Sequence, residues 1–188
     1  MKATLDCINW PGEFPDKPFV EFEILNEASL LRVRFKVRED LTAAAAEKDF
    51  DEVWNDSCVE LFIQFEGDEK YYNIETSCNG RQLMGWRSGR TDSEDAPQSV
   101  LDSIKKTTSL EMGRTFGEMH IDEWTLELEI PASAFWRSGL KSFEGVRAVG
   151  NVYKCNSGMR RQHYVTWAPI STPAPDYHRP EFFRALDF

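Results

Sequence analysis

The sequence contains few of the residues that usually build zinc sites, and these residues are widely spaced. Its 188 residues include four cysteines and three histidines. The cysteines form no CxxC or other short metal-binding spacing, so a Cys/His zinc site has little support. Two of them, Cys58 and Cys78, flank one predicted hairpin and could approach each other. We interpret the cysteines as buried free thiols.

Motifs of several other protein classes are also missing. The sequence has no GxSxG nucleophile motif and no glycine-rich phosphate loop, so neither a catalytic triad nor a nucleotide site is indicated. It has no apolar run long enough to span a bilayer. Residues 1–17 contain no apolar core of a signal peptide. We therefore expect a protein without a membrane span or leader, cytoplasmic by default.

Acidic residues outnumber basic residues, 32 to 22, and give a net charge of −10. Such a surface repels phosphate backbones and anionic membranes, so nucleic acid and membranes are not expected partners. Hydrophobic residues make up 41% of the chain and aromatic residues 13%. This composition is sufficient for a single domain over residues 1–188 with a sizeable core.

Alternation of apolar and polar residues is the main structural signal. Residues 19–25 (FVEFEIL) and 30–38 (LLRVRFKVR) each place apolar side chains on one face and charged side chains on the other, which predicts a hairpin. The glutamates of the first strand would lie beside the basic row of the second, on a solvated sheet face. An anion-binding strip is the less favoured alternative.

The clearest strand lies at residues 58–65 (CVELFIQF), where Val59 and Leu61 share one face and Glu60 the other. A turn, a partner strand, an Asn-Gly turn and a third strand follow, at 71–77 and 81–87. Further strands are predicted at 103–110, 124–131, 146–155, 163–167 and 181–188. About nine short strands and little helix predict an all-β fold, an antiparallel, jelly-roll-like β-sandwich with short helical turns.

We expect the remaining segments to connect these strands. Residues 1–18 contain three prolines and predict an extended arm. Polar composition predicts loops at 88–99 and 112–123, and a proline-rich loop at 168–180. The Ala-rich stretch at 39–52 is the most helix-like part of the chain. It favours a helical turn or two within a long connection.

Two tryptophans do not fit the apolar phase of their neighbours and are candidates for binding. Trp54 precedes its strand in a polar setting, and Trp167 ends its strand just before a loop. Indole faces can stack on the apolar face of a sugar ring, while its hydroxyl groups need fixed donors and acceptors. Arg81 offers donors, and acceptors come from Glu52, Glu60 and Asn151. Plain packing of either tryptophan at a sheet rim is equally compatible with the sequence.

The acidic residues allow other interpretations. An acid on the inner face of a strand is rare unless paired, so Glu60 could simply form a structural ion pair with Arg81. Glycoside hydrolysis needs two carboxylates roughly 5–10 Å apart, and suitable pairs arise by chance among 32 acids. The acidic loops DFDEVWND and EGDE could hold calcium through oxygen ligands.

Several motifs, in this order, resemble those of the family 9 carbohydrate-binding modules and their stand-alone bacterial relatives. They read VWNDSCVELFIQ, YYNIETSCNGR, WTLELEIPASAF, GNVYK and RRQHYVTWAP…HRPEFF. The resemblance covers most of the chain from residue 20 onward. It implies a β-sandwich that binds saccharides without catalysis, in the context of carbohydrate catabolism, and that holds structural calcium.

The resemblance also implies roles for single residues. Two tryptophans sandwich a terminal sugar in these modules, and they match Trp54 and Trp167. The hydrogen-bonding residues match Glu52, Glu60, Arg81 and Asn151. Two alternatives follow from the wider family: an association with glycoside hydrolases, and a haem-binding module of DOMON type. A haem would need axial ligands such as Met84, Met159 or His163.

Overall fold

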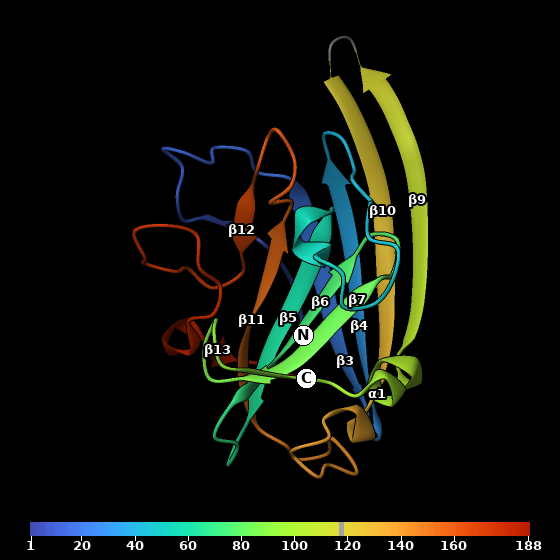
Figure 1. Cartoon of the computed structure of the whole chain (residues 1–188), viewed down its shortest axis with the longest axis vertical. Helices are drawn as coiled ribbons and strands as arrows, with labels where there is room; N and C mark the ends of the chain where they lie inside the picture. The colour runs from blue at the N-terminus through green and yellow to red at the C-terminus, as the bar shows by residue number, and fades with distance from the viewer. Residues whose placement is uncertain (117–118) are drawn as a thin grey trace.

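The computed structural model, which describes residues 1–116 and 119–188, is an antiparallel β-sandwich (Figure 1). In this described part, the first sheet has the strand order β1 (Lys2–Thr4), β3 (Phe19–Glu27), β4 (Leu30–Glu39), β10 (Met119–Pro131) and β9 (Lys105–Phe116). The second has the order β2 (Cys7–Ile8), β12 (Tyr164–Thr166), β11 (Ala148–Cys155), β5 (Cys58–Phe65), β6 (Tyr71–Ser77), β7 (Gln82–Arg87) and β8 (Ser93–Asp95), with β13 (Arg184–Ala185) paired to β11.

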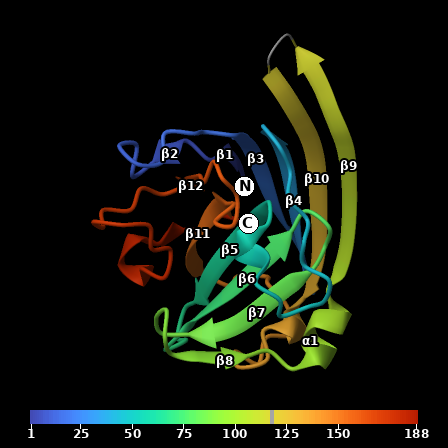
Figure 2. The same ribbon diagram turned by 45° about the horizontal axis from the view of Figure 1, so that its top comes forward.

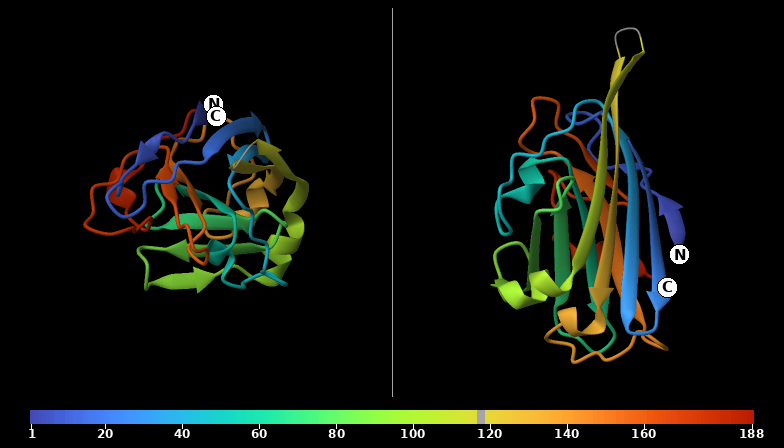
Figure 3. Two further views of the ribbon diagram at one scale, coloured as in Figure 1. Left: turned by 90° about the horizontal axis from the view of Figure 1, so that it is seen from above. Right: turned by 90° about the vertical axis from the view of Figure 1, so that its right-hand side faces the viewer.

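Helical structure is short and lies between strands. One α-helix, α1 (Gln98–Ser103), precedes β9. Three single turns of 3₁₀ helix lie at Val53–Asn55, Ala132–Ala134 and Pro180–Phe182. The predicted all-β class is confirmed. The view from above shows the two sheets as separate layers, and the view from the side shows the β9–β10 hairpin extending past the other strands (Figure 3).

The predicted hairpin of charged strands forms as expected. β3 pairs with β4, and Glu21 and Glu23 lie opposite Lys36 and Arg34. The glutamates of β10 flank the basic row from its other side, where Glu127 forms ion pairs with Arg34. Since acids lie on both sides of the basic row, the structure gives a solvated, charge-balanced face and not an anion-binding strip.

The second sheet is buried on both faces, and this decides where a site can form. Its inner residues, such as Leu61 and Val152, join the main core between the sheets. Its outer residues, such as Phe62 and Tyr153, form a second apolar cluster. The C-terminal segment lies beside β11 and β12 (Figure 2) and contributes Ile170 and Tyr177 to this outer cluster. β5 is therefore buried along both sides.

Several segments differ from the sequence prediction. Of the last predicted strand, 181–188, only Arg184–Ala185 is strand, and a 3₁₀ turn covers Pro180–Phe182. Residues 112–123, predicted as a loop, belong largely to the β9–β10 hairpin, of which residues 117 and 118 lie outside the described part. Backbone pairing along β9 and β10 forms these strands, which extend past the other strands of the sandwich (Figure 3). The predicted loop at 88–99 contains β8 and the start of α1, whose Val100 and Leu101 pack into the core.

The Ala-rich stretch at 39–52 forms no helix, although composition favoured one. Carboxylates bind its backbone N–H groups instead: Asp56 accepts from Ala45 and Ala46 at 2.8 and 3.0 Å. Asp51 accepts from Glu47 and Lys48 in the same way. Side chains that bind N–H groups locally compete with helical hydrogen bonds. The segment is thus held as an irregular connection in front of β5.

A buried ion pair joins the two sheets at one end of the sandwich. Lys154 of β11 forms an ion pair with Glu39 of β4, with Nζ 2.8 Å from Oε2, and both side chains are almost fully buried. The indole of Trp124 donates to the other Glu39 oxygen at 2.6 Å, and Lys154 also donates to Nε2 of His163 at 2.8 Å. Burial and the Lys154 charge lower the pKa of His163 to about 2, so this imidazole accepts as a neutral ring.

Lys154→Met is expected to destabilise the fold strongly. The substitution leaves the Glu39 carboxylate buried without its cation, which typically costs about 3–5 kcal/mol. Lys36→Met is a matched control, since Lys36 pairs with Glu123 at a similar 2.9 Å but on the exposed face of the first sheet. It should cost about 1 kcal/mol or less. Urea unfolding measures both, and equal losses would show that the buried pair has no special role.

Candidate functional site

A pocket of about 320 Å³ lies on the outer face of the second sheet. Strands β5, β6, β7 and β11 provide its floor, and the C-terminal segment forms one wall. Its aromatic lining consists of Trp54, Tyr164, Tyr177 and His178, and its charged lining of Glu60, Glu75, Asp176, Arg87 and Arg90. The pocket thus combines flat rings with a few converging polar groups, which is the usual make-up of a small-molecule site.

The floor follows from the strand register. Glu60 of β5 lies directly opposite Glu75 of β6, and Cys155 of β11 lies opposite Cys58 of β5. Strand alternation turns these side chains to the outer face while Val59 and its neighbours face the core. The acids are therefore in the pocket because the intervening apolar residues occupy the core.

A 3₁₀ turn places Trp54 at the pocket rim. Its backbone carbonyl accepts the N–H of Ser157 at 2.9 Å, which ties this turn to the β11–β12 connection. Gly158 lies so close to Asn55 that an added Cβ would be 2.7 Å from the Asn55 carbonyl oxygen. The close approach of the two loops needs this glycine, and it keeps Trp54 beside the floor.

Arg87 reaches the floor because Gly85 has no side chain. The Arg87 guanidinium donates from Nε to Oδ1 of Asn73 at 2.7 Å. A Cβ on Gly85 would lie 2.9 Å from that oxygen and 3.1 Å from the guanidinium nitrogen. The glycine therefore leaves the space across which Arg87 lies.

The pocket holds two buried acids beside two arginines. Burial, together with the nearby Cys155 and Glu75, raises the pKa of Glu60 well above its ordinary value. Burial also raises the pKa of Glu75. Among the described residues, neither Arg87 nor Arg90 forms an ion pair. Burial therefore favours the protonated forms of both acids, which can donate as well as accept hydrogen bonds.

Aromatic contacts fix the opposite wall. The Tyr177 ring stacks on Tyr153 with centroids 4.2 Å apart, and its hydroxyl donates to the Lys154 carbonyl at 2.9 Å. Nδ1 of His178 lies 2.9 Å from the Tyr71 hydroxyl. Burial and the two arginines lower the pKa of His178 to about 3, so the imidazole is neutral. The wall is therefore preformed by packing.

The structure brings together two of the six residues singled out from the sequence. Trp54 and Glu60 line the same pocket. Glu52, two residues before Trp54, is exposed, and its carboxylate accepts a hydrogen bond from Nδ2 of Asn55 at 2.8 Å. The alternative ion pair between Glu60 and Arg81 is not formed, although both residues are described. Glu60 instead accepts from the Cys155 thiol at 3.1 Å.

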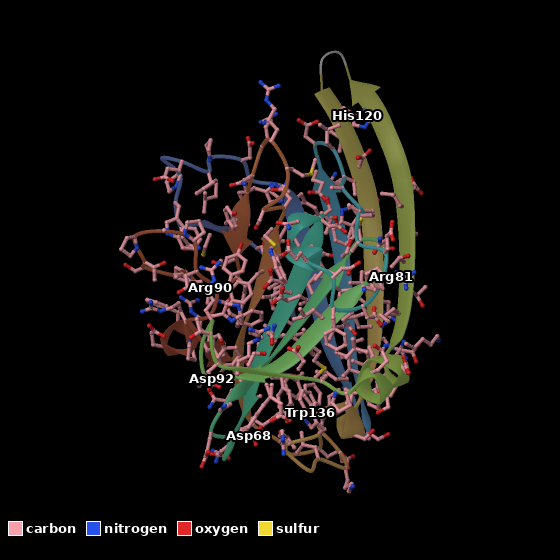
Figure 4. All side chains as sticks on the ribbon, in the orientation of Figure 1. Asp68, Arg81, Arg90, Asp92, His120 and Trp136 are labelled. Carbon is pink, nitrogen blue, oxygen red and sulfur yellow. The ribbon has the colours of Figure 1, made fainter. Side chains whose placement is uncertain are left out.

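The other three residues lie elsewhere. Trp167 packs against the main core, with its ring 6.0 Å from that of Phe22, because it shares the inward phase of Val165. Asn151 is fully buried, and its amide binds both the N–H and the carbonyl of Ala168. Arg81 is exposed, on the side of the molecule away from Arg90 (Figure 4). None of the three lines the pocket.

Sequence patterns did not predict most of the residues that line the pocket. Alternation could have identified Tyr164, since Val165 is a core residue and its neighbours must face outward. The same rule places Arg87 on the outer face with Glu75. Asp176 and His178 lie in the irregular C-terminal segment, where no periodic pattern predicts direction. Cys155 could be assigned to the pocket only from the pairing of β11 with β5. The sequence alone does not show this pairing.

The residues proposed for metal or haem binding are separated. Asp51 and Asp56 of the acidic loop bind backbone N–H groups, and calcium at these loops stays a prediction. Met84 lies in the core between the sheets, while His163 lines a different cavity with Glu39 and Asp40. Met159 accepts a hydrogen bond from Asn156. These three side chains do not surround the pocket on the outer face.

Comparison with known families decides the relationship. A family model described as carbohydrate-binding family 9 matches residues 1–188. The chain belongs to this family. The resemblance noted in the sequence is thereby confirmed, and it extends over the whole chain.

Solved structures support the assignment. A crystal structure of a proposed carbohydrate-binding protein from Bacteroides uniformis has a TM-score of 0.89 and 35% identity, and the match covers 98% of this chain and 84% of that chain. A family 9 module from Caldicellulosiruptor kristjanssonii, solved in complex with cellotriose, has a TM-score of 0.53 over 90% of this chain and 74% of that one. At 9% identity the second likeness shows the fold alone.

A curated relative is also similar. The UPF0462 protein C4orf33 homolog of Rattus norvegicus is 27% identical over 147 residues, which are 75% of this chain. The chain spans 63% of the length of this relative. Within the described residues, no helix is both long and apolar enough to cross a membrane.

Glu60→Gln is expected to change how the stability of this family 9 protein depends on pH. In the unfolded chain Glu60 loses its proton near its ordinary pKa of 4.5, while burial raises this pKa in the folded protein. Above pH 4.5 the folded state then holds the extra proton, so the free energy of unfolding falls as pH rises, by at most about 1.4 kcal/mol per pH unit. Glutamine mimics the neutral acid and removes this slope.

Urea unfolding between pH 4 and 8 measures this effect, with a chelator present to remove metal ions. The stability of Glu60→Gln relative to the parent should increase steadily above pH 4.5. Glu66→Gln removes an exposed carboxylate directly after β5 and controls for the loss of one charge. If Glu60→Gln and the parent give parallel curves, Glu60 is not held neutral by burial.

Proposed function

We propose that this family 9 protein binds a saccharide, without catalysis, in the pocket on the outer face of the second sheet. The observation that carries the proposal is the meeting of Trp54 at the rim with Glu60, Glu75 and Arg87 on the floor of one cavity. A sugar ring needs an apolar surface for its C–H face and fixed polar groups for its hydroxyls. This pocket offers both.

Stacking on Trp54 remains part of the proposal, but the second aromatic partner changes. Trp167 packs into the core, whereas Tyr164 and Tyr177 line the pocket with Trp54. We assign the opposing apolar surface to these tyrosines. Tyr177 is suited to this role because its stacking on Tyr153 holds the ring in place.

The polar groups match hydroxyl chemistry. A hydroxyl both donates and accepts, and a neutral carboxylic acid does the same. Burial raises the pKa of Glu60 and of Glu75 and so favours this form. Arg87 adds a planar set of donors. We assign to it the hydrogen-bond donation that the sequence had suggested for Arg81. The two acids and Arg87 can therefore each form hydrogen bonds with sugar hydroxyl groups.

The affinity should be modest, with Kd in the roughly micromolar to millimolar range, because sugar hydroxyls leave well-satisfied contacts with water. The related module solved with cellotriose makes short glucans the natural first probe. A role in carbohydrate catabolism follows as part of the proposal, with saccharide recognition as the contribution of this chain.

Hydrolysis of a glycosidic bond is a second candidate, favoured by one observation. Glu60 and Glu75 are cross-strand neighbours in the same pocket, and glycosidases use two carboxyl groups. One of the two must be ionised to act as nucleophile or base, however, and burial raises the pKa of both. Binding is therefore the better supported function. Release of reducing sugar from glycans by the parent, abolished in Glu60→Gln, would reverse this order.

Trp54→Ala is expected to weaken saccharide binding roughly tenfold or more, because it removes the stacking surface. Trp167→Phe is the matched control, since Trp167 lies outside the pocket and phenylalanine retains most of its packing. Arg87→Leu should also weaken binding, while Arg81→Leu should not. Calorimetry with cellotriose, preceded by a glycan array to find better ligands, measures these effects.

Equal binding by Trp54→Ala and the parent, for a saccharide that the parent does bind, would overturn the proposed site. Loss of binding in Trp167→Phe and Arg81→Leu, with Arg87→Leu unaffected, would support the arrangement expected from the sequence. No binding to any glycan by the parent would contradict the proposed function itself. Circular dichroism spectra of all variants establish that each is folded.

A further inference from the structure

Two thiols and a carboxylate meet at the floor of the pocket. Cys58 and Cys155 lie directly opposite each other on β5 and β11, and Glu60 lies two residues along β5 on the same face. The two sulfur atoms and a Glu60 oxygen lie within 4.8 Å of one another. The Cys155 thiol donates to the Glu60 carboxylate at 3.1 Å. All three side chains are buried, with exposed fractions of 0 to 3%.

This geometry is close to that of a tetrahedral metal site. Zinc binds cysteine sulfur at about 2.3 Å and carboxylate oxygen at about 2.0–2.2 Å, which sets ligand atoms roughly 3.6–3.8 Å apart. The three atoms here lie within 4.8 Å of one another, with Cys155 Sγ 3.1 Å from Glu60 Oε1. To reach the tetrahedral spacing, each separation would have to change by at most about 1 Å. Small side-chain rotations on fixed strands supply such movements.

Cys58 and Cys155 belong to the outer apolar cluster, but apolar packing does not account for the buried acid between them. Among the described residues, the Cys155 thiol is the only donor that contacts the Glu60 carboxylate. A thiol is a weak donor, and buried carboxylates normally have stronger partners.

We propose that Cys58, Cys155 and Glu60 form a binding site for a thiophilic divalent cation, Zn²⁺ in the first place. Thiolates select such metals over calcium and magnesium. Glu60 and Cys155 line the pocket, so a fourth coordination position opens toward it, as in zinc sites that bind a further ligand. The proposal rests on this cluster alone and goes beyond the proposed saccharide binding.

Charge supports the proposal. Two thiolates and a carboxylate carry three negative charges, and Zn²⁺ leaves one. Arg87 and Arg90 line the same pocket and face that remaining charge without an acidic partner of their own among the described residues. The spacing of the cysteines in sequence argued against a zinc site, because Cys58 and Cys155 are 97 positions apart. The β5–β11 ladder removes that separation.

Cobalt and zinc binding to the reduced protein test the site. The purified chain is treated with reductant and chelator, desalted under nitrogen, and titrated with Co²⁺ in the absence of saccharide. We expect one Co²⁺ per chain, with a thiolate-to-cobalt absorption band that added Zn²⁺ removes stoichiometrically. Cys155→Ser and Cys58→Ser should abolish the band. Cys78→Ser is the matched control, since Cys78 is a buried thiol that donates to the Ala43 carbonyl outside the cluster.

Two results would overturn the proposal. One is a parent protein that stays folded and reduced but shows no thiolate-to-cobalt band. The other is a band that persists in Cys155→Ser and Cys58→Ser, which would place the metal elsewhere. If one serine variant does not fold, the other or Glu60→Gln, expected to weaken zinc binding at least tenfold, keeps the test decisive. Cellotriose binding measured with chelator present reports on the saccharide proposal separately.

Discussion

The site of this protein depends on the burial of the second sheet on both of its faces. A two-layer sandwich needs only one buried face on each sheet, and the first sheet follows that rule with a charged outer face. The second sheet is covered outside as well, by the C-terminal segment and the Trp54 turn. Polar side chains on this outer face are thereby removed from bulk water. A pocket with unusual chemistry is the consequence.

Burial changes the chemistry of ordinary residues. On this face the pKa values of Glu60 and Glu75 are raised, because desolvation disfavours the charged form of a carboxyl group. The same environment places Arg87 beside them without an acidic partner in the described chain. A protein with a net charge of −10 thus contains a small region that is not acidic. Local burial, and not overall composition, sets the character of the site.

Two contacts connect this outer face to the rest of the fold. The ion pair of Lys154 with Glu39 joins the sheets at one end, and Cys155, the next residue along β11, lies on the pocket floor. The close approach at Gly158 ties the Trp54 turn to the same strand connection. β11 therefore contributes to the core on one side and to the pocket on the other.

Local sequence patterns were sufficient to predict the fold class and most strands. Side-chain direction alternates along a strand, so a strand with one face in the core has apolar residues at every second position. They also identified Trp54 and Glu60, whose residue types conflict with their neighbours. They could not place Trp167, Arg81 or Asn151, since rim packing and ligand contact leave the same local pattern. The meeting of Cys58, Glu60 and Cys155 was decided by the β5–β11 register alone. Long-range pairing is set by the packing of the whole sandwich, and no local pattern of residues encodes it.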